Sequence, residues 1–134
     1  MELKMELTLD QSLKKGFDAH QSGLTHEAHH IYRAILETQP NHAEANHVMG
    51  LLTLELGDAE NSLVFFKTAL EANPSSGQFW LSYIDTLIQL GLTMQAQVAL
   101  YQAKFKGVSG EAFDLREQQL TTNQLNSTDQ NTLT

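Results

Sequence analysis

The sequence predicts an all-α protein built from helix pairs that repeat every 34 residues. Three observations support this fold class. The chain has only two prolines, Pro40 and Pro74, and they lie 34 positions apart, while Gly23, Gly57 and Gly91 recur at the same interval. Apolar residues recur every three or four positions, as on one face of a helix. No stretch alternates with period two for long enough to form a strand.

Further columns align when position 1 of each unit is set at Leu9, Ala43 and Gly77. Small residues at positions 8 and 20 let two antiparallel helices approach closely, and a large apolar residue at position 24 fills the space beside them. Position 8 holds Gly16 and Gly50, position 20 holds Ala28, Ser62 and Ala96, position 24 holds Tyr32, Phe66 and Leu100, and position 27 holds Ile35, Ala69 and Ala103.

Glycine at position 15 is expected to end the first helix of each unit in a left-handed conformation, and proline at position 32 to end the second helix of the first two units. Capping side chains are expected where each unit begins, because Thr8, Asn41 and Ser75 stand three residues before Gln or Glu. Asp58 can cap the second helix of the second unit. The expected helices are 9–22 and 26–38, 43–56 and 59–72, and 77–90 and 93–106, in units 9–42, 43–76 and 77–108.

Residues 109–120 are expected to form a seventh helix, from about 110, that caps the array. Ala112, Phe113, Leu115 and Leu120 lie near one of its faces and would cover the apolar flank that a further unit would bury. Residues 121–134 are polar and rich in Thr and Asn, which predicts a disordered tail or a linker. Residues 1–8 form an N-terminal extension.

The 34-residue unit, with Gly at 8 and 15, Ala at 20, an aromatic at 24, Ala at 27 and Pro at 32, resembles the tetratricopeptide repeat (TPR). The best match is AEANHVMGLLTLELGDAENSLVFFKTALEANP, and the resemblance covers residues 9–108. Trp stands at position 4 only in the third unit, as Trp80, where the other two units have Ser12 and Asn46. In the third unit Ile84 also replaces Gly at position 8, and the unit ends in KGVSG rather than in Pro. The resemblance implies a right-handed superhelical array of three TPR helix-turn-helix repeats plus a C-terminal capping helix. It also implies a concave groove lined by the first helix of each repeat.

Groove positions carry an apolar strip, which is typical of a binding surface. The candidate partner-binding residues are Leu13, Phe17, His47, Val48, Leu51, Leu54, Leu81, Ser82, Asp85 and Ile88. Two other interpretations stay open: these residues pack between helices as core, or residues 1–8 or a second copy of the chain fill the groove.

The leading hypothesis is a non-catalytic protein–protein interaction module that binds a peptide or partner helix with apolar contacts and basic flanks. One alternative is the N-terminal regulatory domain of a larger enzyme of the glycosyltransferase, methyltransferase or sulfotransferase type, since the chain resembles the TPR front end of bacterial multidomain proteins. Another is a self-associating scaffold, hence a homo-oligomer. TPR modules that hold acidic chaperone tails use basic and amide side chains where this chain has Leu13, Phe17, Val48, Gln78 and Ser82.

Composition argues against several other classes of function. The net charge of −8, with scattered basic residues, argues against nucleic acid. The chain has no cysteine, no apolar run of membrane-spanning length and no catalytic or phosphate-binding motif, so we expect a cytoplasmic protein that is not an enzyme, without cofactor or membrane partner. His26 and His30 have the spacing of a metal-chelating pair, but no set of ligands completes it, and a solvated helix face is the preferred interpretation.

Overall fold

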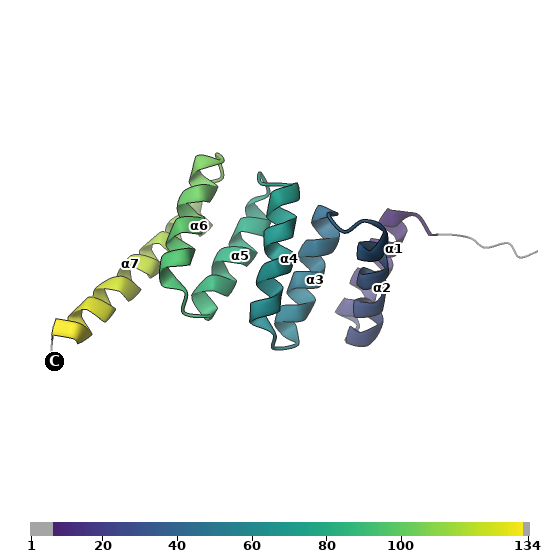
Figure 1. The fold of residues 1–134 in the computed structure, drawn as a ribbon, viewed down its shortest axis with the longest axis horizontal. Helices are drawn as coiled ribbons and strands as arrows, with labels where there is room; N and C mark the ends of the chain where they lie inside the picture. The colour runs from purple at the N-terminus through teal and green to yellow at the C-terminus, as the bar shows by residue number, and fades with distance from the viewer. Residues whose placement is uncertain (1–6, 133–134) are drawn as a thin grey trace, which may run out of the picture. The chain divides into compact units, whose positions relative to one another are not determined.

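The computed structural model describes residues 7–132, with side chains described to residue 123. These residues form seven helices and no strand (Figure 1). The helices are α1 (Leu9–Gln21), α2 (Thr25–Thr38), α3 (Ala43–Glu55), α4 (Ala59–Ala72), α5 (Gly77–Gln89), α6 (Thr93–Phe105) and α7 (Glu111–Thr132). The all-α prediction is confirmed, with three helix pairs followed by one further helix.

The seventh helix is longer than the sequence predicted. It was expected to end at residue 120, and the structure continues it to Thr132. The segment from residue 121 to residue 132 contains neither Gly nor Pro, so nothing in its backbone chemistry stops the helix. Residues 133–134 of the predicted tail, and residues 1–6 of the N-terminal extension, lie outside the described residues.

Local signals explain where the helices begin and end. Thr8 and Gln11 form the predicted capping box at the start of α1, and the Asn61 backbone N–H donates to Asp58 at 3.2 Å. The other two predicted caps were one residue early, because the side chains that accept the backbone bonds are His42 and Ser76. The helix ends are confirmed: the glycines at position 15 of the three units have φ of 78, 87 and 74°.

The chain divides into two compact units, with the boundary between Ala69 and Leu70 inside α4. In the first unit, α1 packs against α2 and α2 against α3. Its core consists of Ala19, Ala28, Tyr32, Ile35, Ala45, Met49 and Leu52. In the second unit, α5 packs against α6, and α7 packs against both of them, with Phe113 and Leu120 buried.

The close approach predicted at position 8 is present in the first two repeats. A Cβ at Gly16 would lie 2.4 Å from Cε1 of Tyr32, and one at Gly50 would lie 2.5 Å from Cε1 of Phe66. Each ring therefore lies directly on the backbone of the preceding helix. In the third repeat the same two positions hold Ile84 and Leu100, which are both buried. A larger residue on one helix thus accompanies a smaller one on the other, which conserves volume.

Position 4 ties each of the later repeats to the proline that ends the preceding one. The side-chain amide of Asn46 donates to the Pro40 carbonyl at 3.0 Å, and the indole N–H of Trp80 donates to the Pro74 carbonyl at 2.7 Å. Trp80, which stood out from the repeat pattern, therefore performs the same anchoring as Asn46 with a larger side chain. Each proline lies beyond the end of the preceding helix, so each bond gives a donor to a carbonyl outside the helical hydrogen-bond ladder.

None of the helices in the described part of the chain combines the length and apolarity needed to cross a membrane.

Candidate functional site

The candidate residues of the first unit lie on α1 and α3. Leu13 and Val48 are half-buried and pack against the core of this unit. Leu51 and Leu54 are also half-buried, whereas Phe17 is 51% exposed. Leu13 and Val48 therefore belong partly to the core, as one of the open interpretations expected, whereas the Phe17 ring is exposed to solvent.

A hydrogen bond joins α1 to α3 beside these apolar residues. Nε2 of His20 lies 2.6 Å from Oε2 of Glu55, and the Glu55 side chain remains largely exposed. Phe17 lies one helical turn before His20, and Leu51 lies one turn before Glu55, so both apolar residues lie on the same side of this bond. The two helices thus present an apolar area bordered by a carboxylate.

His47 was predicted to contact a partner, and the structure corrects this prediction. Its side chain is buried, at 2% exposure, and its ring packs against that of Phe66 with centroids 5.7 Å apart. Gly50, one turn further along α3, has no side chain to hold the Phe66 ring away, so the ring covers the helix there and covers His47 with it. Burial lowers the pKa of His47 to about 4.

The candidate residues of the second unit lie on α5. Leu81, Ser82 and Ile88 are half-buried and Asp85 is exposed. The Asp85 carboxylate accepts two hydrogen bonds from Arg116 of α7, both at 2.9 Å. This paired geometry is the strongest form of ion pair between side chains, and the hydrogen bond to Asp85 raises the pKa of Arg116 above its usual range. Asp85 is therefore held in an ion pair with a residue of its own unit.

Sequence reasoning missed the contribution of α7 to this face. Counting 34 residues on from Gly77 reaches Glu111, where α7 begins, so α7 occupies the place of the first helix of a fourth repeat. The residues of α7 that correspond to Leu81 and Ser82 of α5 are Leu115, which is 53% exposed, and Arg116. The repeat period itself was the signal that could have found them.

Within residues 7–123, whose side chains the structure describes, no three or more His, Cys, Asp or Glu residues are close enough together to hold a metal ion. His26 and His30 lie exposed on α2. The metal-chelating pair considered from the sequence therefore has no further ligand in the described part of the chain.

No protein-family profile matches the chain, and no curated protein matches it. Solved structures, in contrast, match this chain. The TPR domain of Sgt2 from Aspergillus fumigatus matches with a TM-score of 0.76 and 15% identity, over 96% of this chain and 88% of that one. The Yersinia enterocolitica type III secretion chaperone SycD, in complex with a peptide of the translocator YopD, matches with a TM-score of 0.69 and 17% identity, over 85% and 87%.

A third structure is the first TPR of Spaghetti (RPAP3) bound to the HSP90 peptide SRMEEVD. It matches with a TM-score of 0.76 and 10% identity, over 91% of this chain and 99% of that one. These likenesses show that the chain has the tetratricopeptide-repeat fold.

Proposed function

We propose that this protein is an interaction module that binds a peptide or helix of another protein on the α1–α3 face of its first unit. The observation that carries the proposal is the apolar area that the half-exposed ring of Phe17 on α1 and the half-buried Leu51 and Leu54 on α3 form together, because a group of apolar side chains that reaches solvent is typical of a binding surface. The likeness to the SycD and RPAP3 structures supports it, since both of those proteins are seen with bound peptides.

Charge indicates which peptides this face would prefer. The Glu55 side chain is 61% exposed at the border of the apolar area, and the whole chain carries a net charge of −8. The one lysine on the groove positions of α1, Lys14, pairs with Asp18 on its own helix. A partner with apolar anchors and basic flanks complements such a surface.

An acidic tail such as SRMEEVD fits this face poorly. The positions at which TPR modules hold carboxylates have Leu13, Phe17 and Val48 here, and none of these side chains can neutralise a negative charge. The proposed ligand class therefore differs from the one in the RPAP3 structure. The alternative of an enzyme front end finds no support in the comparisons with solved structures.

The proposal is tested with a fluorescent amphipathic peptide that carries leucines at helical spacing and lysines at both ends. Changing Leu51 and Leu54 together to Glu should weaken its binding about tenfold or more, because two carboxylates would face apolar anchors. Phe17→Ala should act in the same direction. Fluorescence anisotropy measures the affinity, and circular dichroism confirms that each variant is helical.

Two controls make the outcome decisive. Val64→Glu changes an exposed valine on α4 and should leave the affinity unchanged. The same peptide with glutamates in place of its lysines should bind at least several-fold more weakly. Equal binding by the wild type and the Leu51/Leu54 variant would move the site away from α1 and α3, and equal binding of both peptides would remove the role of charge.

A further inference from the structure

Helix α6 carries an exposed apolar stripe that the proposed function does not use. The stripe consists of Met94, Val98, Tyr101 and Phe105, which are 79, 56, 73 and 82% exposed. Their spacing of four, three and four residues places all of them along one face of the helix. Large apolar side chains scattered singly on a surface are ordinary, but four in a row on one helix are not.

The repeat provides an internal reference for this stripe. All the equivalent residues of the first two repeats, at positions 18, 22, 25 and 29, are exposed as well. They are His26, His30, Arg33 and Glu37 on α2, and Glu60, Val64, Lys67 and Glu71 on α4. Exposed positions that are mainly charged or polar in two repeats are thus wholly apolar in the third, although the fold needs nothing different from them there.

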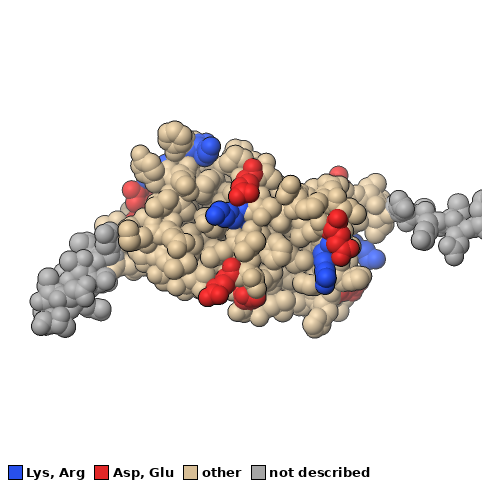
Figure 2. All heavy atoms as spheres, in the orientation of Figure 1, with Lys and Arg blue, Asp and Glu red and all other residues tan. Residues whose placement is uncertain are grey.

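Charge also sets α6 apart. Each of the other six helices contains at least one Asp or Glu, whereas α6 contains none and carries Lys104. The residues that flank the stripe on the same helix are Gln95, Gln97, Gln102 and Lys104. Figure 2 shows few charged side chains over α6, with blue atoms near its upper end. In a chain with a net charge of −8, this is a surface that another negatively charged protein can approach with less repulsion than at the helices that carry Asp or Glu.

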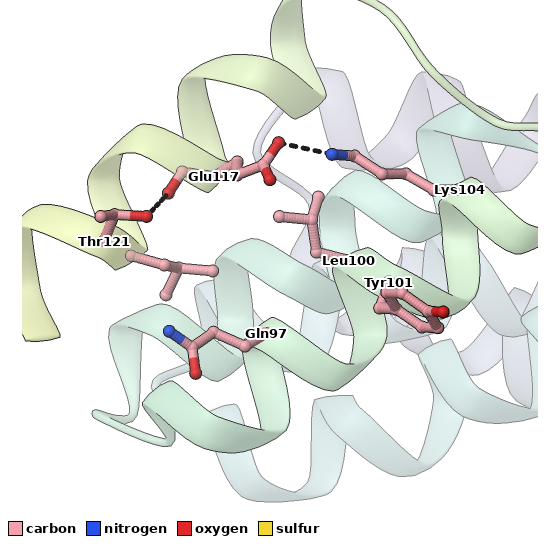
Figure 3. Close-up of a pocket in the computed structure, with 7 residues that line it drawn as sticks. Gln97, Leu100, Tyr101, Lys104, Glu117 and Thr121 are labelled. Carbon is pink, nitrogen blue, oxygen red and sulfur yellow. Dashed lines mark hydrogen bonds and ion pairs between the residues drawn. The ribbon is translucent and has the colours of Figure 1, made fainter.

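The side of α6 that faces α5 and α7 is already occupied. Leu100 of α6 and Leu120 of α7 are buried, Lys104 pairs with Glu117, and the Thr121 hydroxyl donates to the Glu117 carbonyl (Figure 3). A cleft of about 170 Å³ remains between the two helices, with Tyr101 among the residues that line it. Contacts with α5 and α7 therefore hold α6 in place, while the stripe points away from the core.

We propose that the stripe is a dimerisation surface, on which α6 of one copy packs antiparallel against α6 of a second copy. Spacings of four, three and four are those of a coiled-coil seam, which interdigitates with a like seam. Antiparallel pairing about a two-fold axis between residues 98 and 101 sets Met94 against Phe105 and Val98 against Tyr101. Every contact then joins a smaller apolar residue to an aromatic ring.

A second copy fits this surface better than a charged partner would. The flanking glutamines can hydrogen-bond to each other across the two-fold axis, and no carboxylate of α6 is brought near its symmetry mate. Four side chains of this size and exposure amount to several hundred Å² of apolar surface, which is at the low end of stable interfaces. The dimer is therefore expected to exchange with monomer in the micromolar range.

The mass in solution tests the proposal. Sedimentation of the full chain from about 1 to about 200 µM should show the mass rising from 15.0 kDa toward twice that value. Met94→Glu, Tyr101→Lys and Phe105→Glu together copy the residues of α4 onto α6 and should keep the chain monomeric throughout. Because these side chains are exposed, the variant should retain its helicity and melting temperature.

Val64→Lys, at the position of α4 that corresponds to Val98, is the matched control and should dimerise like the wild type. A wild-type chain that stays monomeric to the highest concentration overturns the proposal. A triple variant that still dimerises also overturns it, since the contact then lies elsewhere.

Orientation can be tested separately because the chain has no native cysteine. Met94→Cys and Phe105→Cys are prepared as two single variants and oxidised alone and as a mixture. Antiparallel packing predicts a disulfide-linked dimer in the mixture and little in either variant alone, since residue 94 of one copy faces residue 105 of the other. Linkage within each variant alone would overturn the antiparallel arrangement.

Discussion

His47 is neutral in the folded protein and protonated in the unfolded chain over a range of mildly acidic pH. Burial beneath Phe66 lowers its pKa from 6.5 to about 4. Between these values the unfolded state binds a proton that the folded state excludes, so the free energy of unfolding falls as the pH falls. The stability that neutral His47 contributes is fully present above pH 6.5 and is lost progressively toward pH 4.

Urea denaturation at pH 7, 5.5 and 4.5 measures this effect. Against the His47→Gln variant, the wild type should lose roughly 2 kcal/mol of additional unfolding free energy over this range. The variant keeps the other five histidines, so the difference between the two curves isolates His47. Parallel curves for the two proteins would show that His47 is protonated in the folded state.

Two details of single residues were predicted wrongly from the sequence, each for its own reason. The caps at His42 and Ser76 lie one residue after the predicted ones, because runs of polar residues such as Ser75–Ser76 offer several side chains that can accept the same bond. His47 was placed in the groove because its position faces the groove in the repeat. Its burial depends on the Phe66 ring, which reaches it from another helix.

Helix pairing depends on matched sizes at positions 8 and 24. Tyr32 lies directly on Gly16, and its buried hydroxyl has no hydrogen-bond partner among the described residues. Gly16→Ala should lower the free energy of unfolding by about 1–3 kcal/mol, because the new methyl group overlaps a ring that core packing holds in place. Thermal or urea denaturation measures the change.

The third repeat suggests the compensating change. With Tyr32→Leu, which imitates Leu100, the added methyl group has room, and Gly16→Ala should become neutral or stabilising because Ala favours a helix over Gly by about 1 kcal/mol. A double-mutant cycle gives the coupling between the two sites. If the alanine costs the same in both backgrounds, the ring contact is not the cause.

At the scale of elements, the sequence predicted six of the helices to within one residue at each end. Glycine at position 15 ends the first helix of each pair, and Pro40 and Pro74 follow the ends of α2 and α4, whereas α6 ends before Gly107, which has a φ of 82°. The seventh helix lacks such a stop, and its polar composition was wrongly equated with the absence of a helix beyond residue 120. Composition indicates whether a segment can bury surface, whereas helix continuation also depends on the absence of a stop signal.

At the scale of the whole molecule, the 34-residue period accounts for most of what could be predicted. It located the helix pairs and the close contacts of Gly16 and Gly50, because small and large residues must alternate at fixed offsets when helices stack. The same period also locates the α6 stripe and the groove residues of α7. They are found by comparing equivalent positions of successive repeats. The prediction that the candidate residues form one groove along all three repeats stays a prediction.

The net charge of −8 makes the two proposed surfaces respond to salt in opposite directions. Two copies of a negatively charged chain repel each other, and salt screens this repulsion, so the α6 dimer should tighten about two- to fivefold between 50 and 500 mM NaCl. A peptide with basic flanks is attracted to the α1–α3 face, so its affinity should fall by a similar factor. Sedimentation and anisotropy at the same salt concentrations measure both responses.

The signs of the two responses also identify the forces involved. A dimer that weakened with salt would be held by ion pairs rather than by Met94, Val98, Tyr101 and Phe105. Binding of the basic-flanked peptide that did not change with salt would mean that its lysines contact no carboxylate, and that Glu55 does not select the partner. Because the triple α6 variant and the Leu51/Leu54 variant each remove one surface, each salt response should disappear in one variant and persist in the other.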